Sequence, residues 1–423
     1  MPPAVFATVK RTMRRPEIRA WVVAATVVAA GVLAALTWSG KGTGPDQLWR
    51  RAHEAIQAGQ WDRAEAELAR LGRARPPTAQ DWMLQAQLAM ATGRVDAAVA
   101  ALAKVPDAHN LASQARLRAG QIELRRDRLH AAEEAFRAAS RLDPNLVQAR
   151  RELIYIYGMQ GRRAEIDEQF RALVNLTPLT FDNALHWGLM SHESWQPDLV
   201  TEELGRFVRA DPTDRWSRLA WAGSLRRIGR VDDAWQALES LPASDPEARA
   251  QRAQLALERG DLAAAETLLA GGPSDHAGLA RLRGRLALGK RDGPSALRHF
   301  GVADAAEPGS RDVTLGLAQA WTLIGDEAKA KPYLEAARRR DAVFSLLERA
   351  RNPGANHDVA LFRQLGEACA SEGREDEARA WLALALARDP LDAEAQRALF
   401  RLRTGSGQVG TRATTTPSAV ESP

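Results

Sequence analysis

Residues 114–144 read QARLRAGQIELRRDRLHAAEEAFRAASRLDP, and this stretch decides the fold. Gly120 lies seven residues before Asp127, an Ala follows five residues after it, and Phe136 follows nine after it. Offsets of five and nine share one face of an α-helix, so the second half is an amphipathic helix. Pro144 closes the stretch because Pro cannot continue a helix interior. The stretch predicts two helices joined by a tight turn.

The same pattern recurs ten times along the chain. The position equivalent to Asp127, here called the turn position, recurs at spacings of 34 residues five times, and then of 31, 31, 34 and 48. A small residue lies seven before it in nine repeats, and a large apolar residue lies nine after it in all ten. The turn positions are Gly59, Gly93, Asp127, Gly161, Trp195, Gly229, Gly260, Arg291, Gly325 and Gly373.

This pattern resembles the tetratricopeptide repeat (TPR) family in its period and in its small, Ala, apolar and Pro positions. Residues 362–390, FRQLGEACASEGREDEARAWLALALARDP, carry the whole pattern again. The resemblance covers about 360 of the 423 residues. It implies an all-α fold, a right-handed superhelical solenoid of about ten TPR helix-turn-helix units with a long concave face.

The pattern and the composition together predict the chain's organisation. We expect nine repeats over residues 45–342, an insertion at 343–356 with a short extra helix and a loop, and a tenth repeat at 357–390. A helix at 391–403 is expected to cap the stack, and the small, polar residues 404–423 are expected to be disordered. The turn of repeat five is expected to be distorted, since Trp195 and Pro197 break its pattern.

A membrane-spanning segment is expected before the repeats. Residues 20–38, AWVVAATVVAAGVLAALTW, contain no charge and no Pro, and as a helix they would extend about 28 Å. Residues 1–19 carry five basic residues against Glu17 alone. By the positive-inside rule this predicts a single-pass protein with a cytoplasmic N-terminal segment and a periplasmic repeat region. The alternative is a cleaved signal peptide and a soluble exported protein.

Composition excludes several classes of function. One Cys rules out a disulfide framework or a four-Cys metal module, and the His residues show no metal spacing, so neither a cofactor nor a metal is expected. Four of the five excess positive charges lie in residues 1–19, so the rest of the chain is close to neutral. This argues against a nucleic-acid partner, whose phosphates need many basic side chains. No small-molecule substrate is expected, because no catalytic motif is present.

The first helix of each repeat is expected to line a partner-binding groove. Residues ten and six before the turn position share the face opposite the small residue. In repeats one to five, and again in repeat eight, these are Trp49, His53, Met83, Gln87, Leu117, Gln121, Arg151, Tyr155, Leu185, Leu189, Arg281 and Arg285.

We therefore expect a non-enzymatic scaffold that binds a protein or peptide in this groove. With the membrane segment, the sequence favours a role in assembling an envelope or secretion complex. The alternative from another class is the substrate-recognition part of an enzyme complex. No segment outside the repeats exceeds about 45 residues, which leaves no room for a separate catalytic domain.

Overall fold

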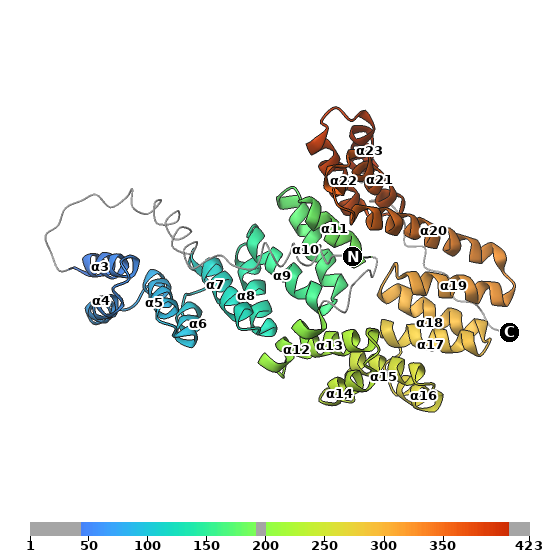
Figure 1. Ribbon diagram of the computed structural model, residues 1–423, viewed down its shortest axis with the longest axis horizontal. Helices are drawn as coiled ribbons and strands as arrows, with labels where there is room; N and C mark the ends of the chain where they lie inside the picture. Colours follow the sequence, from blue (N-terminus) through green and yellow to red (C-terminus); the bar gives the residue numbers. More distant parts are fainter. Residues whose placement is uncertain (1–43, 192–199, 406–423) are drawn as a thin grey trace. The chain divides into compact units, whose positions relative to one another are not determined.

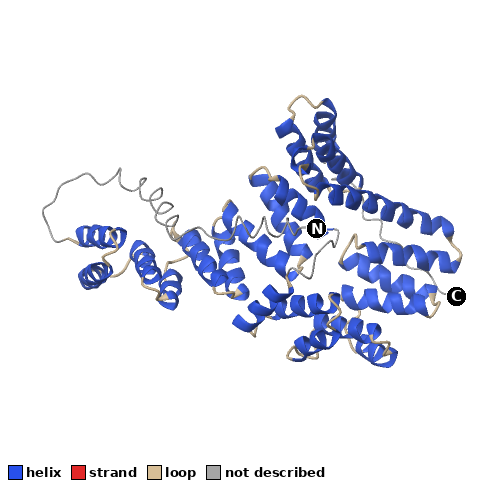
Figure 2. Cartoon of the chain, viewed as in Figure 1, coloured by secondary structure: helices blue, strands red, loops and turns tan. Residues whose placement is uncertain are grey.

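The computed structural model describes residues 44–191 and 200–405. Within these residues the chain is helical, with 21 α-helices, one short 3₁₀ turn and no strand (Figure 2). The helices are α3 (Pro45–Gln57), α4 (Trp61–Ala74), α5 (Ala79–Ala91), α6 (Val95–Ala103), α7 (Ala112–Arg125), α8 (Leu129–Leu142), α9 (Val147–Gln160), α10 (Arg163–Leu176), α11 (Phe181–Ser191), α12 (Thr201–Ala210), α13 (Arg215–Arg227), α14 (Val231–Glu239), α15 (Pro246–Glu258), α16 (Leu262–Ala270), α17 (Ala277–Gly289), α18 (Gly293–Ala306), α19 (Arg311–Ile324), α20 (Glu327–Ala350), α21 (Val359–Ser371), α22 (Glu375–Arg388) and α23 (Ala393–Gly405).

Each turn position that the structure describes has a left-handed backbone. Seven of them are Gly, with φ between 68° and 88°, and the two others are Asp127 at 61° and Arg291 at 58°. A left-handed residue lets the chain reverse within two or three residues, and Gly adopts it without a steric penalty. This explains why Gly recurs at this position. The turn position of repeat five, Trp195, lies outside the described residues.

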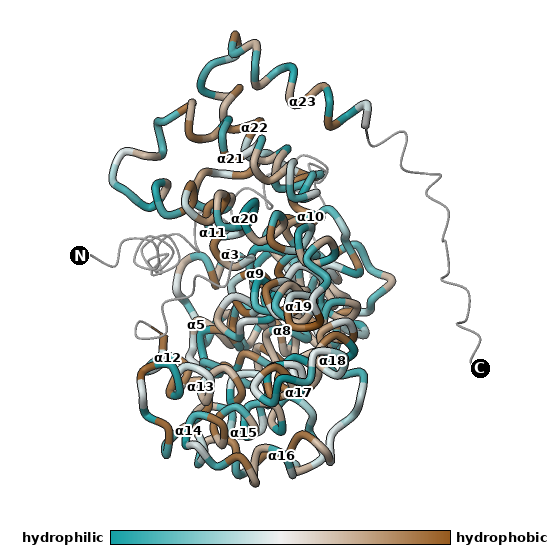
Figure 3. Tube along the Cα trace, turned by 90° about the vertical axis from the view of Figure 1, so that its right-hand side faces the viewer, coloured by the Kyte–Doolittle hydropathy of each residue, from teal (hydrophilic) through white to brown (hydrophobic). Residues whose placement is uncertain are grey.

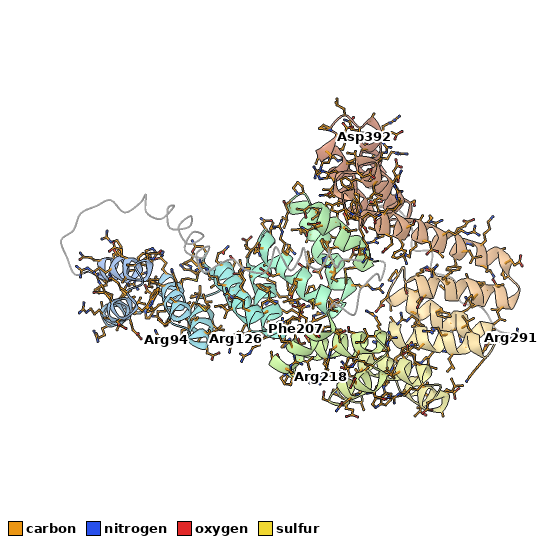
Figure 4. The ribbon with its side chains drawn as sticks, in the orientation of Figure 1. Arg94, Arg126, Phe207, Arg218, Arg291 and Asp392 are labelled. Atoms are coloured by element: carbon orange, nitrogen blue, oxygen red, sulfur yellow. The ribbon has the colours of Figure 1, made fainter. Side chains whose placement is uncertain are left out.

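Replacing Arg291 with Gly is expected to stabilise the protein by about 1 kcal/mol, because a left-handed conformation costs a non-Gly residue about that much. Arg291 is exposed at the turn between α17 and α18 (Figure 4), so its side chain contributes little packing. The midpoint of urea unfolding measures the gain. Asp127→Gly is the control with a smaller expected gain, because Asp127 accepts a hydrogen bond from Arg206 at 2.7 Å. An unchanged midpoint for Arg291→Gly would contradict the argument.

The small residue of the first helix receives a large side chain from the second helix of the same repeat. A Cβ on Gly120 would lie 2.6 Å from the ring of Phe136, and one on Gly284 would lie 2.9 Å from the ring of Phe300. In the tenth repeat, Leu382 fills the equivalent space at Gly366. Along the helices, apolar and polar stretches alternate, as expected for helices with one buried face (Figure 3).

The chain divides into two compact units. One comprises residues up to 169 together with 196–241, and the other comprises residues 170–195 together with 242 onward. The chain therefore leaves the first unit within α10, contributes α11 to the second, and returns to the first for α12, α13 and α14.

In the first unit, helix pairs follow one another from α3 to α8, and each second helix packs against its own first helix (Figure 1). At the far end, α9 contacts α13 directly. The amide of Gln160 lies 3.3 Å from the hydroxyl of Ser217, and the Arg162 guanidinium lies 4.6 Å from the centre of the Trp216 ring. The first helix of repeat six thus follows the first helix of repeat four.

In the second unit, the pairs α15–α16, α17–α18, α19–α20 and α21–α22 pack in sequence, and α23 packs on α21 and α22. α11 contacts α20 and α22. Its Phe181 lies 5.5 Å from Phe362 and 6.1 Å from Trp381 between ring centres. The first helix of repeat five is therefore packed against the last repeats of the chain.

Residues 343–350 differ from the expected insertion. They are not a separate short helix, because they continue α20, which runs unbroken over 24 residues. Val343 and Leu347 are fully buried and anchor this extension in the second unit. A 3₁₀ turn at Ala355–His357 then leads into α21.

The predicted localisation is corrected by the structure. Among residues 44–191 and 200–405, no helix is both long and apolar enough to cross a bilayer. α20 is the one described helix longer than 18 residues, and acidic and basic side chains recur along it. This contradicts the single-pass membrane protein with a periplasmic repeat region that the sequence suggested. The segments at 1–19 and 20–38, and residues 406–423 of the expected disordered tail, lie outside the described residues.

Candidate protein-interaction groove

The first helices of neighbouring repeats contact one another, which places their faces side by side. α3 contacts α5 in the first unit, and α15, α17 and α19 contact in order in the second. Gln121 in α7 and Glu152 in α9 approach to 3.5 Å, joining the first helices of repeats three and four. Within each unit the first helices are therefore neighbours, as the expected groove requires.

The structure places the twelve predicted groove residues in two groups. The eight from Trp49 to Tyr155 belong to the first unit, and the other four belong to the second. Leu117, Leu185 and Leu189 are buried, with exposed fractions of 7%, 2% and 7%, and serve the core. Those left partly or fully exposed are Trp49, His53, Met83, Gln87, Gln121, Arg151, Tyr155, Arg281 and Arg285.

Trp49 and His53 form an aromatic pair at the start of the first unit. Their rings stack, with centres 5.3 Å apart and planes 8° from parallel. Burial lowers the pKa of the His53 imidazole, and the nearby carboxylate of Glu54 partly opposes this shift. His53 is therefore neutral near pH 7 and presents a flat, uncharged surface together with the indole.

Glu152 and its neighbours form a polar cluster farther along the groove. Burial raises the pKa of the Glu152 carboxyl, while hydrogen bonds from Gln148 and Gln121 oppose that shift. The bond from Gln148 measures 2.6 Å. Arg125 is the basic group that acts on the Glu152 carboxylate, and the adjacent Arg151 forms no ion pair within the described part of the chain.

Tyr155 is covered at the far end of the groove. Burial raises the pKa of its hydroxyl, and the carboxylate of Glu203 in α12 raises it further. Arg206, also in α12, donates a 2.7 Å hydrogen bond to Asp127 in the turn of repeat three. α12 therefore lies close to repeats three and four and limits access to Tyr155.

Sequence reasoning missed Arg118, one position from the predicted face in α7. It is half-buried, burial lowers its pKa, and no carboxylate contacts it among the described residues. The sequence did contain a signal for it. Arg118 lies nine residues before its turn position, where other repeats carry an apolar residue such as Leu84 or Leu282. Arg118 and Arg151 are thus two basic side chains of first helices without an ion-pair partner among the described residues.

The described residues hold no cluster of His, Cys, Asp or Glu that could bind a metal. The one Cys, Cys369, is buried in α21, and burial raises the pKa of its thiol. A nucleophile needs the thiolate form, so this Cys is unsuited to that role.

Comparison with known proteins gives one family and several similar folds. The family model described as tetratricopeptide repeat matches residues 50–113 and 83–147. No curated protein matches the sequence.

Among solved structures, a tetratricopeptide repeat protein from Parabacteroides merdae is 16% identical, with a TM-score of 0.30 over 66% of this chain and 99% of that chain. PilW, a type IV pilus biogenesis factor, is 18% identical, with a TM-score of 0.27 over 49% and 100%. Human IFIT1, solved with PPP-AAAA, is 15% identical, with a TM-score of 0.33 over 81% and 94%. Similarity at this level does not indicate what this chain binds.

The family match therefore covers repeats one to three, and the same left-handed turns and filled small-residue positions continue beyond them to the tenth repeat. The chain is a tetratricopeptide repeat protein.

Proposed function

We propose that the chain is a non-enzymatic scaffold for protein–protein interaction, and that the first-unit groove lined by Trp49, Met83, Gln87, Gln121 and Arg151 holds an extended segment of a protein partner. One observation carries the proposal. Trp49, Met83, Gln87, Gln121 and Arg151 lie partly exposed on the first helices of repeats one to four, and Arg151 has no ion-pair partner within the described part of the chain.

A peptide supplies acceptors as backbone carbonyls and acidic side chains. Trp, Met and Arg are also the residue types enriched where proteins bind one another. The unpaired arginines Arg118 and Arg151 favour a partner segment that carries carboxylates.

The expected role in envelope or secretion assembly rested on the membrane segment and is not retained. The second-unit positions Arg281 and Arg285 are a weaker candidate surface, since Arg285 already bonds to Gln254 at 3.3 Å.

Photo-crosslinking in the producing cells tests the proposal. A photoreactive amino acid at Met83 or Gln87 is expected to capture one discrete partner. The same amino acid at Arg73, exposed on the second helix of repeat one, is the control and is expected to capture none. Capture from Arg73 alone, or no difference between the positions, would contradict the groove as the binding surface.

Charge reversal at Arg151 provides the matching prediction. Arg151→Glu is expected to reduce capture from Met83 at least tenfold, because it places a carboxylate where the partner's own acidic groups would lie. Arg73→Glu makes the same charge change on an exposed surface and is expected to leave capture unchanged. Circular dichroism of both variants checks that the helices are intact.

A further inference from the structure

The first unit contains a hollow away from the predicted groove positions. Its volume is about 300 Å³, and side chains of α8, α9 and α10 line it. None of these side chains is among the twelve predicted groove residues, and three of them are Arg. The lining residues are Arg137, Ser140, Arg141, Arg150, Leu153, Tyr157, Glu168 and Gln169.

The hollow is separate from the groove because α9 turns a different face to each. Arg150, Leu153 and Tyr157 follow one another at spacings of three and four residues, so they share one face of α9. The groove residues Arg151 and Tyr155 lie on another face, since successive positions on a helix are about 100° apart. A ligand in the hollow and a partner in the groove can therefore be tested separately.

Arg150 is held in place by the loop that precedes α9. Its guanidinium donates to the carbonyl oxygen of Pro144 at 2.9 Å and 3.1 Å, and to the amide oxygen of Gln169 at 3.1 Å. In repeat six, Arg218 holds the carbonyl of Pro212 in the same way, at 2.8 Å. All these acceptors are neutral. The charge of Arg150 is therefore not compensated by a carboxylate within residues 44–191 and 200–405.

Arg141 adds a second uncompensated charge. It is exposed, and it forms no hydrogen bond or ion pair with another residue that the structure describes. Glu168, also exposed and without a described partner, is the one acidic side chain among the lining residues. The unpaired charges at the hollow are thus two positive and one negative, and this balance favours an anion.

Tyr157 supplies a buried hydroxyl, since its side chain is only 1% exposed. The hydroxyl accepts a 2.9 Å hydrogen bond from Arg137, whose own charge is paired with Glu133 at 3.0 Å. Arg162, over the ring at 4.5 Å, is paired with Glu133 and Glu165. Burial raises the pKa of Tyr157 to about 12, and the carboxylate of Glu133 adds to this shift, so the hydroxyl keeps its proton. It can donate that proton to a ligand in the hollow.

We propose that this hollow binds the phosphate group of a small molecule. Arg141, Arg150 and Tyr157 offer donors from two helices, and guanidinium groups match the geometry of phosphate oxygens. A tetrahedral phosphate accepts from several directions at once, whereas a carboxylate has two oxygens in one plane. The volume is at the lower end for ligand pockets, which restricts the ligand to a small one.

Repeat one provides a matched control position. Arg73 occupies the position equivalent to Arg141, fourteen residues after the turn position, and is likewise exposed. The residues of repeat two equivalent to Arg150 and Tyr157 are Trp82 and Ala89. Arg73 therefore has the same exposed charge without the second cation and without the hydroxyl.

Equilibrium dialysis of the full chain against radiolabelled inorganic phosphate, at low ionic strength, tests the proposal. We expect saturable binding of one phosphate per chain. Arg141→Gln is expected to weaken it about tenfold, because it removes a charged donor, and Arg73→Gln is expected to leave it unchanged. Glu168→Gln is expected to strengthen it several-fold, because it removes a negative charge from the lining. Circular dichroism checks that each variant keeps its helices.

Competition identifies the class of ligand. Glycerol 3-phosphate is expected to displace the label, and acetate at the same ionic strength is expected not to. Three results would each overturn the proposal: no saturable binding by the unmodified chain, equal losses for Arg141→Gln and Arg73→Gln, or displacement by acetate as effective as that by glycerol 3-phosphate.

Discussion

Replacing Phe300 with Ala is expected to lower the free energy of unfolding of the second unit by about 3–5 kcal/mol, the usual cost of removing a buried Phe. The Phe300 side chain is 1% exposed. Its ring lies against the positions that a Cβ would take on both Gly284 and Gly316, so it packs two successive first helices at once. Urea unfolding followed by circular dichroism measures the loss.

Two further variants separate packing from a general effect of mutation. Leu262→Ala removes an apolar side chain that is 56% exposed and is expected to change the free energy of unfolding by no more than about 0.5 kcal/mol. Gly284→Leu overfills the space beside Phe300 and is expected to cost about 1–3 kcal/mol alone. Combined with Phe300→Ala, it should recover part of the loss. If Phe300→Ala costs no more than Leu262→Ala, the packing described here is wrong.

Replacing Arg162 with Met is expected to destabilise the first unit by about 3–5 kcal/mol, because removing one partner of a buried ion pair leaves the other charge uncompensated. Arg162 pairs with Glu133 at 2.7 Å, and the two side chains are 5% and 4% exposed. The guanidinium also lies over the rings of Tyr157, at 4.5 Å, and Trp216, at 4.6 Å. This single side chain therefore joins repeats three, four and six.

An exposed pair in the same unit is the control. Arg230 and Asp233 lie 2.6 Å apart, with side chains 57% and 46% exposed. Arg230→Met is expected to cost less than about 1 kcal/mol, since water and salt screen such pairs. The double variant Arg162→Met with Glu133→Gln is expected to be more stable than Arg162→Met alone. Equal losses at Arg162 and Arg230 would show that the buried pair has no special role.

The repeats were predictable because their rules are local. A Gly that turns the chain, and a small residue that meets a large one sixteen positions later, act within a single helix pair. Such rules leave a period in the sequence that needs no knowledge of distant contacts. The two described turn positions that are not Gly, Asp127 and Arg291, also adopt the left-handed conformation.

The packing of α11 was not predictable because it depends on partners far along the chain. The periodicity predicts Leu204, sixteen residues later, as the neighbour of Gly188, whereas the structure places Leu347 there. The same limit applies to the groove. Leu185 and Leu189 occupy groove positions in the sequence but are buried in the second unit, where α11 packs against α20 and α22. Leu117 is buried too, and helix periodicity alone does not separate a groove face from a half-buried one.

The central claim is that α11, the first helix of repeat five, packs against α20 and α22 in the second unit. The distance between α11 and α22 tests this claim most directly. Spin labels at Asp182 in α11 and Ala383 in α22, both exposed, report it by pulsed electron paramagnetic resonance in the full chain. Packed helices have axes about 8–10 Å apart, so the account predicts a short-distance population. The pair at Glu367 and Ala383, on the neighbouring helices α21 and α22, is the control. The account would be contradicted if the control pair gave a short-distance population and the pair at Asp182 and Ala383 gave none.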